Sequence, residues 1–96
     1  MQLRNLNKIL AARNQIKYLS GRIGECKNLT HINLDCNVLE MIPSEIGLLQ
    51  DTLLVLKLAE NKLKQLTLST RDLHKLEILN IANNGLTQLP EGIERM

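Results

Sequence analysis

The chain has 96 residues, which suits a single domain, and its net charge of +2 comes from 12 basic and 10 acidic residues. A charge this small, spread along the chain without long runs, argues against a nucleic-acid-binding or membrane-surface protein. Hydrophobic residues make up 44% of the chain but aromatic residues only 1%, so we expect a core built from thin layers of branched aliphatic side chains.

Four segments of the chain repeat one pattern, L-x-x-L-x-L-x-x-N-x-L, with Ala11 as the main misfit. Their first leucines are Leu6, Leu29, Leu53 and Leu76. Their asparagines, spaced 23, 24 and 23 residues apart, are Asn14, Asn37, Asn61 and Asn84. We therefore expect one domain over 1–96, divided into repeats 6–28, 29–52, 53–75 and 76–96, with residues 1–5 as the end of a partial preceding repeat.

Within each repeat the fourth and sixth positions show the period-2 pattern of a strand with one buried face. The strands are predicted to lie side by side in a parallel sheet, the first from about Lys8 to Ala12. The asparagine follows each strand, where the chain must turn while buried. Its amide is expected to bond backbone groups that the turn would otherwise leave without partners.

The segments between the strands are predicted to return behind the sheet. Ser20-Gly21 opens the first return, and Pro43-Ser44 followed by helical spacing predicts a short α or 3-10 turn in the second. One extra residue near Asp51-Thr52 is expected to lie in a loop. The third return has Thr70 where the others have isoleucine, and we expect Leu68 to fill the core in its place.

The extended pattern, with L-P-x-x-I after the asparagine, resembles the cytoplasmic leucine-rich repeats of about 23 residues. Leu86-Thr-Gln-Leu-Pro-Glu-Gly-Ile93 is close to that consensus, and Leu39-Glu-Met-Ile-Pro-Ser-Glu-Ile46 nearly so. The chain is similar to the repeats of Ras-binding scaffold proteins and related plant intracellular proteins, and to the repeat module of cytoplasmic deadenylases. The resemblance implies an α/β solenoid with four short parallel strands on a concave face and helical or 3-10 returns on the convex face.

Residue patterns that would indicate catalysis or metal binding fail on their placement. Cys26, His31 and Cys36 form C-x4-H-x4-C, but the repeat register places Cys26 toward the core and the other two on the strand side, too far apart to share a zinc ion. Gly21-Arg-Ile-Gly24 heads a return segment and lacks the helix–loop–helix context of an RNA-binding loop. The return-segment serines do not meet a histidine base. We expect no enzyme, no cofactor and no metal.

Function is expected on the concave sheet face, where the third, fifth, seventh and eighth template positions are exposed. The seventh positions, Ala12, Asp35, Ala59 and Ala82, are small and leave room for a partner, and the side chain of Ala59 is expected to point to solvent. The predicted contact residues are Lys8, Leu10, Arg13, His31, Asn33, Asp35, Val55, Lys57, Ala59, Glu60, Ile78, Asn80 and Asn83. A merely solvated sheet is the alternative.

Two function classes stay open. The first is a non-catalytic protein–protein interaction module in signalling or complex assembly. The second is a small structural subunit of a large ribonucleoprotein or other assembly, where nucleic acid is contacted only as part of the assembly. Neither end shows a polar cap, so we expect self-association, cover by neighbouring chains, or a longer array of which this is a piece.

The setting is expected to be cytoplasmic, with a nuclear one left open. The first ten residues carry charge and polarity where a signal peptide needs an unbroken apolar segment. No apolar stretch approaches the length of a membrane span. Cys26 and Cys36 do not form the spacing of a disulfide-stapled secreted scaffold.

Overall fold

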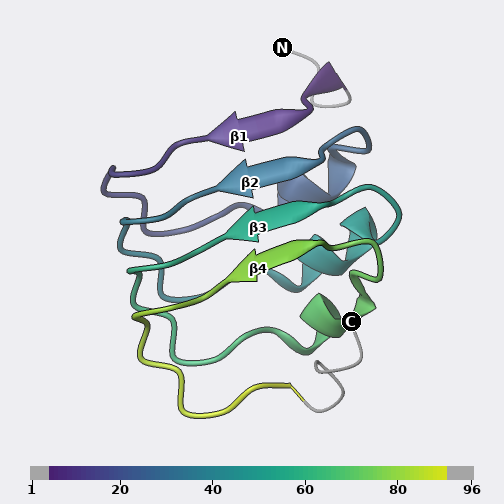
Figure 1. Ribbon diagram of the computed structural model, residues 1–96. Helices are drawn as coiled ribbons and strands as arrows, with labels where there is room; N and C mark the ends of the chain where they lie inside the picture. The colour runs from purple at the N-terminus through teal and green to yellow at the C-terminus, as the bar shows by residue number, and fades with distance from the viewer. Residues whose placement is uncertain (1–4, 91–96) are drawn as a thin grey trace.

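A computed structural model describes residues 5–90. Four short strands lie side by side, and three 3-10 helices run behind them (Figure 1). The strands are β1 (Lys8–Leu10), β2 (His31–Asn33), β3 (Val55–Lys57) and β4 (Ile78–Asn80), and the helices are η2 (Gly21–Glu25), η3 (Ser44–Leu49) and η4 (Leu68–Asp72). The predicted α/β solenoid of parallel strands with 3-10 returns is confirmed.

The sheet is parallel throughout, in the order β1-β2-β3-β4. Ile9 pairs with Ile32, Ile32 with Leu56, and Leu56 with Leu79, so the register follows the spacing of the repeats. Each template position therefore forms a straight column across the sheet. The first strand, Lys8–Leu10, is shorter than the expected range from Lys8 to Ala12, although the N–H of Ala11 still donates to the carbonyl of Asn33 in the next layer.

The core lies between the sheet and the 3-10 helices. Its best-buried side chains are the template leucines and isoleucines of the two interior layers, each 0% or 1% exposed: Leu29, Ile32, Leu34, Leu39, Ile46, Leu49, Leu53, Leu56, Leu58, Leu63 and Leu73. The corresponding residues of the first and last layers, such as Ile9 and Ile81, are only half-buried. Each layer is thus completed by the layer next to it.

The asparagines form the predicted ladder. Asn61 Nδ2 donates to the carbonyls of Leu34 in the preceding layer (2.9 Å) and Leu58 in its own (3.0 Å), while its Oδ1 accepts from the N–H of Leu39 (3.0 Å). Asn37 and Asn84 make the equivalent bonds one layer away. The buried turn therefore keeps its backbone groups paired, at the cost of fixing one residue type at this position.

The extra residue of the second repeat lies in the turn after η3, as predicted. The N–H groups of Thr52 and Leu53 both donate to the carbonyl of Leu49, at 3.2 and 3.0 Å. The added residue is absorbed by this wider turn, so β3 enters the sheet in the same register as the other strands.

The expectation that Leu68 replaces Thr70 in the core is wrong. Thr70 is 1% exposed and Leu68 is 55% exposed. Thr70 occupies the middle of η4, at the template position where Ile23 and Ile46 are buried in η2 and η3. The backbone geometry shared by the three returns thus decides which side chain is buried, even where a more hydrophobic one stands nearby. The Thr70 hydroxyl has no hydrogen-bond partner within the described part of the chain.

Two expectations fall largely outside the described residues: the end of a preceding repeat at 1–5 and the last part of the fourth return. In residues 5–90, none of the helices has the length and apolar composition needed to cross a membrane.

Leu34→Ala tests the register of the core. Leu34 lies in an interior layer at 1% exposure, and truncating a buried leucine costs roughly 2–5 kcal/mol of unfolding free energy. That loss is a large share of the roughly 5–15 kcal/mol by which a folded domain is usually stable. We expect a thermal melt to shift strongly downward, and a melt that overlays the wild type would contradict the packing described.

Thr70→Val tests the unpaired hydroxyl. The substitution keeps the shape of the side chain and removes a buried polar group without a partner, so we expect a stabilisation of about 1 kcal/mol. Chemical denaturation of the two proteins measures the difference. Thr87→Val is the control, because Thr87 is exposed and its substitution is expected to change stability by no more than about 0.5 kcal/mol. An equal gain in both variants, or a loss at Thr70, would contradict the interpretation.

Candidate functional site

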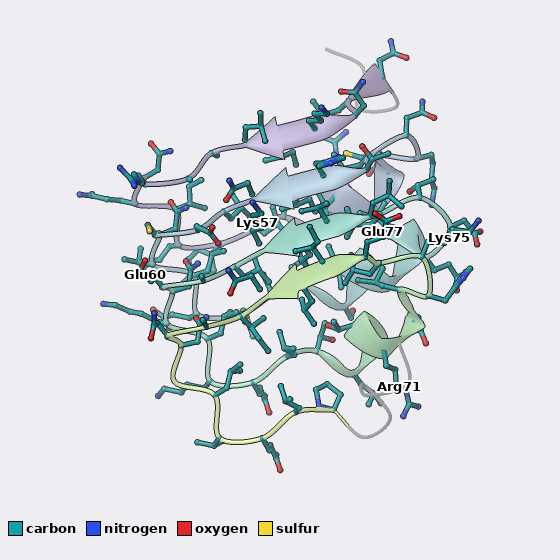
Figure 2. All side chains as sticks on the ribbon, viewed as in Figure 1. Lys57, Glu60, Arg71, Lys75 and Glu77 are labelled. Carbon is teal, nitrogen blue, oxygen red and sulfur yellow. The ribbon has the colours of Figure 1, made fainter. Side chains whose placement is uncertain are left out.

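The side chains on either side of each buried strand centre point away from the core, onto the face that we call the concave sheet face. Its two columns on the strands are Lys8, His31, Val55 and Ile78, and Leu10, Asn33, Lys57 and Asn80. Figure 2 shows Lys57 on β3 and Glu60 in the turn beyond that strand. The register places all eight side chains on one continuous surface.

Apolar exposure on this face is concentrated on the two edge strands. Leu10 on β1 is 72% exposed and Ile78 on β4 is 48% exposed. Between them, Val55, His31 and Lys57 are half-buried by their neighbours. The centre of the face is therefore shielded and partly polar, and its margins are apolar.

The two asparagines of the fifth column use their oxygen atoms internally. Asn33 Oδ1 accepts from the N–H of Asp35 at 3.2 Å, and Asn80 Oδ1 accepts from the N–H of Ala82 at 3.1 Å. These bonds hold the backbone where it leaves the strand, and they occupy the oxygen of each amide, which leaves its NH₂ group to bond a partner. The face consequently offers a partner donors more than acceptors at these two positions.

His31 is held by a residue that sequence reasoning missed. Thr30 Oγ1 lies 2.8 Å from His31 Nδ1 and 3.1 Å from the carbonyl of Asn7. A hydroxyl has one proton, and the carbonyl can only accept, so the threonine donates to Asn7 and accepts from His31 Nδ1–H. The assignment leaves Nε2 as the ring atom that faces a partner. The signal in the sequence was only a threonine directly before the strand.

The seventh column is less open than predicted. Ala59 is 9% exposed, so the expectation that its side chain points to solvent is wrong. Asp35 Oδ1 accepts from the N–H of Ala59 at 2.7 Å, which brings the Asp35 side chain across the neighbouring layer. A large side chain at Ala59 would collide with this arrangement. The carboxylate of Asp35 thus has a structural role as well as an exposed surface.

The eighth column forms the turn at the carboxyl ends of the strands. Arg13, Cys36, Glu60 and Asn83 all have positive φ, between 56° and 62°. Asparagine tolerates this left-handed conformation, whereas each of the other three costs on the order of 1 kcal/mol. Their N–H groups donate across the layers, which compensates the strain: Arg13 to the carbonyl of Asp35, Cys36 to that of Ala59, and Glu60 to that of Ala82.

Both cysteines are free thiols, and neither is poised for reaction. Burial raises the pKa of the Cys26 thiol, which is 1% exposed beside η2. The pKa of Cys36 is raised mainly by its hydrogen bond to the Glu60 carboxylate, with Sγ to Oε2 at 3.4 Å. Cys26 lies in the core and His31 on the sheet face, and within residues 5–90 no three metal-ligating side chains gather.

Comparison with known proteins agrees with this architecture. The family model for Leucine Rich Repeat matches residues 28–49 and 75–96. This chain is a leucine-rich repeat protein. Among solved structures, a leucine-rich repeat protein of Leptospira interrogans superposes with a TM-score of 0.84 at 32% sequence identity, over 95% of this chain. The chain spans 22% of the length of that protein.

Membership of this family gives the general function. Leucine-rich repeat domains are protein–protein interaction modules and typically not enzymes, so this chain is an interaction module in that general sense. The fold does not by itself say which partner is bound or where.

Glu60→Asn tests the contact between Cys36 and Glu60. The substitution removes the carboxylate that raises the pKa of Cys36, and asparagine suits the left-handed backbone at this position. Since the thiolate is the reactive form, we expect the rate–pH profile of Cys36 alkylation to move to lower pH. The rate is measured with iodoacetamide and mass spectrometry.

The control is Glu40→Asn, which removes an exposed carboxylate elsewhere on the chain. Its profile is expected to match that of the unmodified chain. A Glu60→Asn profile that is unchanged, or moved to higher pH, would show that the hydrogen bond does not control this thiol.

Proposed function

We propose that the chain binds an extended protein segment across its concave sheet face, as an interaction module in signalling or complex assembly. The observation that carries the proposal is that this face combines side-chain donors on all four strands with exposed apolar side chains on its two edge strands. Polar side chains would suffice at both edges of a sheet that is only solvated, but here the side chains of Leu10 and Ile78 are 72% and 48% exposed. Exposed apolar area next to polar groups is the usual composition of a binding surface.

The chemistry of the face indicates the chemistry of the partner. Lys57 and Lys8 supply ammonium groups, and the amides of Asn33 and Asn80 have NH₂ groups left to bond a partner because their oxygens are already bonded. Donors of this kind recognise backbone carbonyls and carboxylates. We therefore assign as partner a peptide segment that carries acidic side chains and a few apolar ones.

A nucleic-acid backbone is a poorer fit to the same surface. Phosphate recognition draws on several cationic side chains per site, whereas the two strand columns interleave Lys8 and Lys57 with Leu10, Val55 and Ile78. The carboxylate of Glu60 borders the face at the turn (Figure 2), and that of Asp35 lies at the N–H of Ala59 beside it. Binding is thus expected to depend on salt only moderately.

We also propose a reducing, cytoplasmic setting. The supporting observation is that Cys26 and Cys36 are both free, one in the core and one at the turn beyond β2. A chain whose thiols cannot pair with each other suits a compartment that keeps thiols reduced.

Lys57→Glu is the decisive variant for the binding face. A phage-displayed random peptide library is selected on the immobilised chain, and the selected peptides are measured by calorimetry. We expect enrichment of Asp and Glu in these peptides. Reversing the charge of Lys57 is expected to weaken their binding at least about tenfold, which corresponds to about 1.4 kcal/mol.

Lys64→Glu is the matched control, because it makes the same charge reversal on an exposed residue of the return segment. It is expected to leave peptide affinity unchanged. Melting curves of both variants separate lost binding from lost folding. If Lys64→Glu abolishes binding while Lys57→Glu retains it, the working surface is convex. Selection of no acidic peptides would overturn the assigned partner.

A further inference from the structure

The same backbone hydrogen bonds connect each repeat layer to the next. We call each such interface between two neighbouring layers a joint. The sixth-position N–H of one layer donates to the fifth-position carbonyl of the next, at 2.8 to 2.9 Å: Ala11 to Asn33, Leu34 to Lys57 and Leu58 to Asn80. The eighth-position N–H donates to the seventh-position carbonyl of the next layer in the same way, as in the bond from Glu60 to Ala82. At these positions each layer donates toward the layer that follows it, whereas at the second position the N–H of the later layer donates back, as from Leu54 to the carbonyl of Thr30 and from Glu77 to that of Leu54.

The two edges of the described sheet are therefore complementary to each other. β4 carries the N–H groups of Ile81 and Asn83 in the positions that donate at every interior joint. β1 carries the carbonyls of Leu10 and Ala12 in the positions that accept. Within residues 5–90 the sheet holds no further strand beside β1 or β4 to use these groups. Such edges are templates for pairing with another chain.

Within residues 5–90, the first and last hydrophobic layers are also less buried than the interior ones. Leu58 is 0% exposed in an interior layer, whereas Ala11 and Ile81 at the equivalent position are half-buried. Leu89 is 50% exposed, while Leu66, one repeat earlier, is 5% exposed. At the β1 end a hollow of about 160 Å³ has apolar walls from Leu6, Ile9, Leu19, Ile23 and Cys26.

We propose that a second copy of this chain docks head to tail, with its β1 edge on the β4 edge of the first copy. The register follows from the interior joints, where Lys8 pairs with His31 and His31 with Val55. Across the new joint Ile78 pairs with Lys8 of the second copy, and Asn80 with its Leu10. The Ile81 N–H donates to the carbonyl of that Leu10.

The asparagine ladder continues through this joint. Inside the chain, Asn84 Nδ2 donates to the carbonyl of Leu58 in the preceding layer, and Asn84 Oδ1 accepts from the N–H of Leu63. Asn14 of the second copy takes the place of Asn84 in this scheme. Its Nδ2 then donates to the carbonyl of Ile81, and its Oδ1 accepts from the N–H of Leu86.

Nothing in the facing columns opposes the contact. Within the described residues, none of the sheet positions compared below places two like charges opposite each other, and the small Ala11 of the second copy faces Ile81. The pairs across the joint, first copy first, are Glu77 with Asn7, Ile78 with Lys8, Asn80 with Leu10, Ala82 with Ala12, and Asn83 with Arg13. A contact between two different surfaces leaves a free edge on each copy, so further copies can add.

Cross-linking tests the register directly. Lys8→Cys and Ile78→Cys are made separately in a Cys36→Ser background and mixed at concentrations up to about 1 mM, the weak end of specific association. Because neighbouring strands lie about 4.8 Å apart, a short thiol-to-thiol reagent joins the two positions. We expect cross-linked dimers in the mixture and none in either variant alone.

Two outcomes of this experiment would overturn the proposal. Dimers of Ile78→Cys alone would show a symmetric contact between two β4 edges. A mixture that gives no dimers, or no more than Lys8→Cys mixed with Lys64→Cys, would show that the edges do not meet. Lys57→Glu, which tests the concave sheet face, leaves the cross-link unchanged, so the two proposals can fail separately.

Sedimentation velocity provides the second measurement. The sedimentation coefficient of the full chain is expected to rise with concentration. Leu89→Lys places a charge on the apolar end layer and is expected to weaken association at least tenfold. Met41→Lys is the matched control, since Met41 is 60% exposed in an interior repeat, and it is expected to associate like the wild type. A concentration-independent monomer, or equal effects of the two lysines, would contradict the head-to-tail joint.

Discussion

The structure depends on one buried side chain per repeat, the asparagine that joins each layer to the layer before it. Asn61 is 7% exposed and bonds the carbonyls of Leu34 and Leu58 while accepting from the N–H of Leu39. Only an amide supplies two donors and an acceptor in so small a space. Since these bonds span two layers at a fixed spacing, they set the register of the solenoid, and a slip by one residue would break them all.

A fixed register is also what turns separate strands into a surface. Because every layer places the same template position at the same point, a partner meets columns of side chains and not isolated residues. The internal bonds of Asn33, Asn80 and Thr30 then fix the orientation of individual groups on those columns. The backbone of the face is thus preorganised, so binding a segment carries no entropic cost for ordering that backbone.

The sequence alone was sufficient for the strands, the buried template positions and the asparagine ladder, because all three follow from one spacing repeated four times. It was insufficient where a local hydrogen bond or the shape of the return segment decides which side chain is buried. The spacing could not show that Asp35 reaches across to the N–H of Ala59, or that Ala59 is buried at 9% exposure. At Thr70 hydrophobicity favoured Leu68 for the core, but the middle of a 3-10 helix points inward whatever residue stands there. The binding role of the predicted face stays a prediction.

The layered arrangement also connects stability with association. Within residues 5–90, the main backbone contacts run between neighbouring elements, from η2 to η3 to η4 and from β1 through to β4. The stability of such a chain is approximately a sum of layer terms and joint terms. The first and last layers each have one joint within residues 5–90, and their core residues Ile9 and Ile81 are half-buried. Anything that completes an end layer adds a joint of the interior kind, so binding at an end stabilises the fold by mass action.

A ligand on the concave sheet face instead bridges several layers at once and stabilises the joints it spans. Stability measured against concentration therefore distinguishes the two modes, since self-association at the ends depends on the chain's own concentration and face binding on the ligand's.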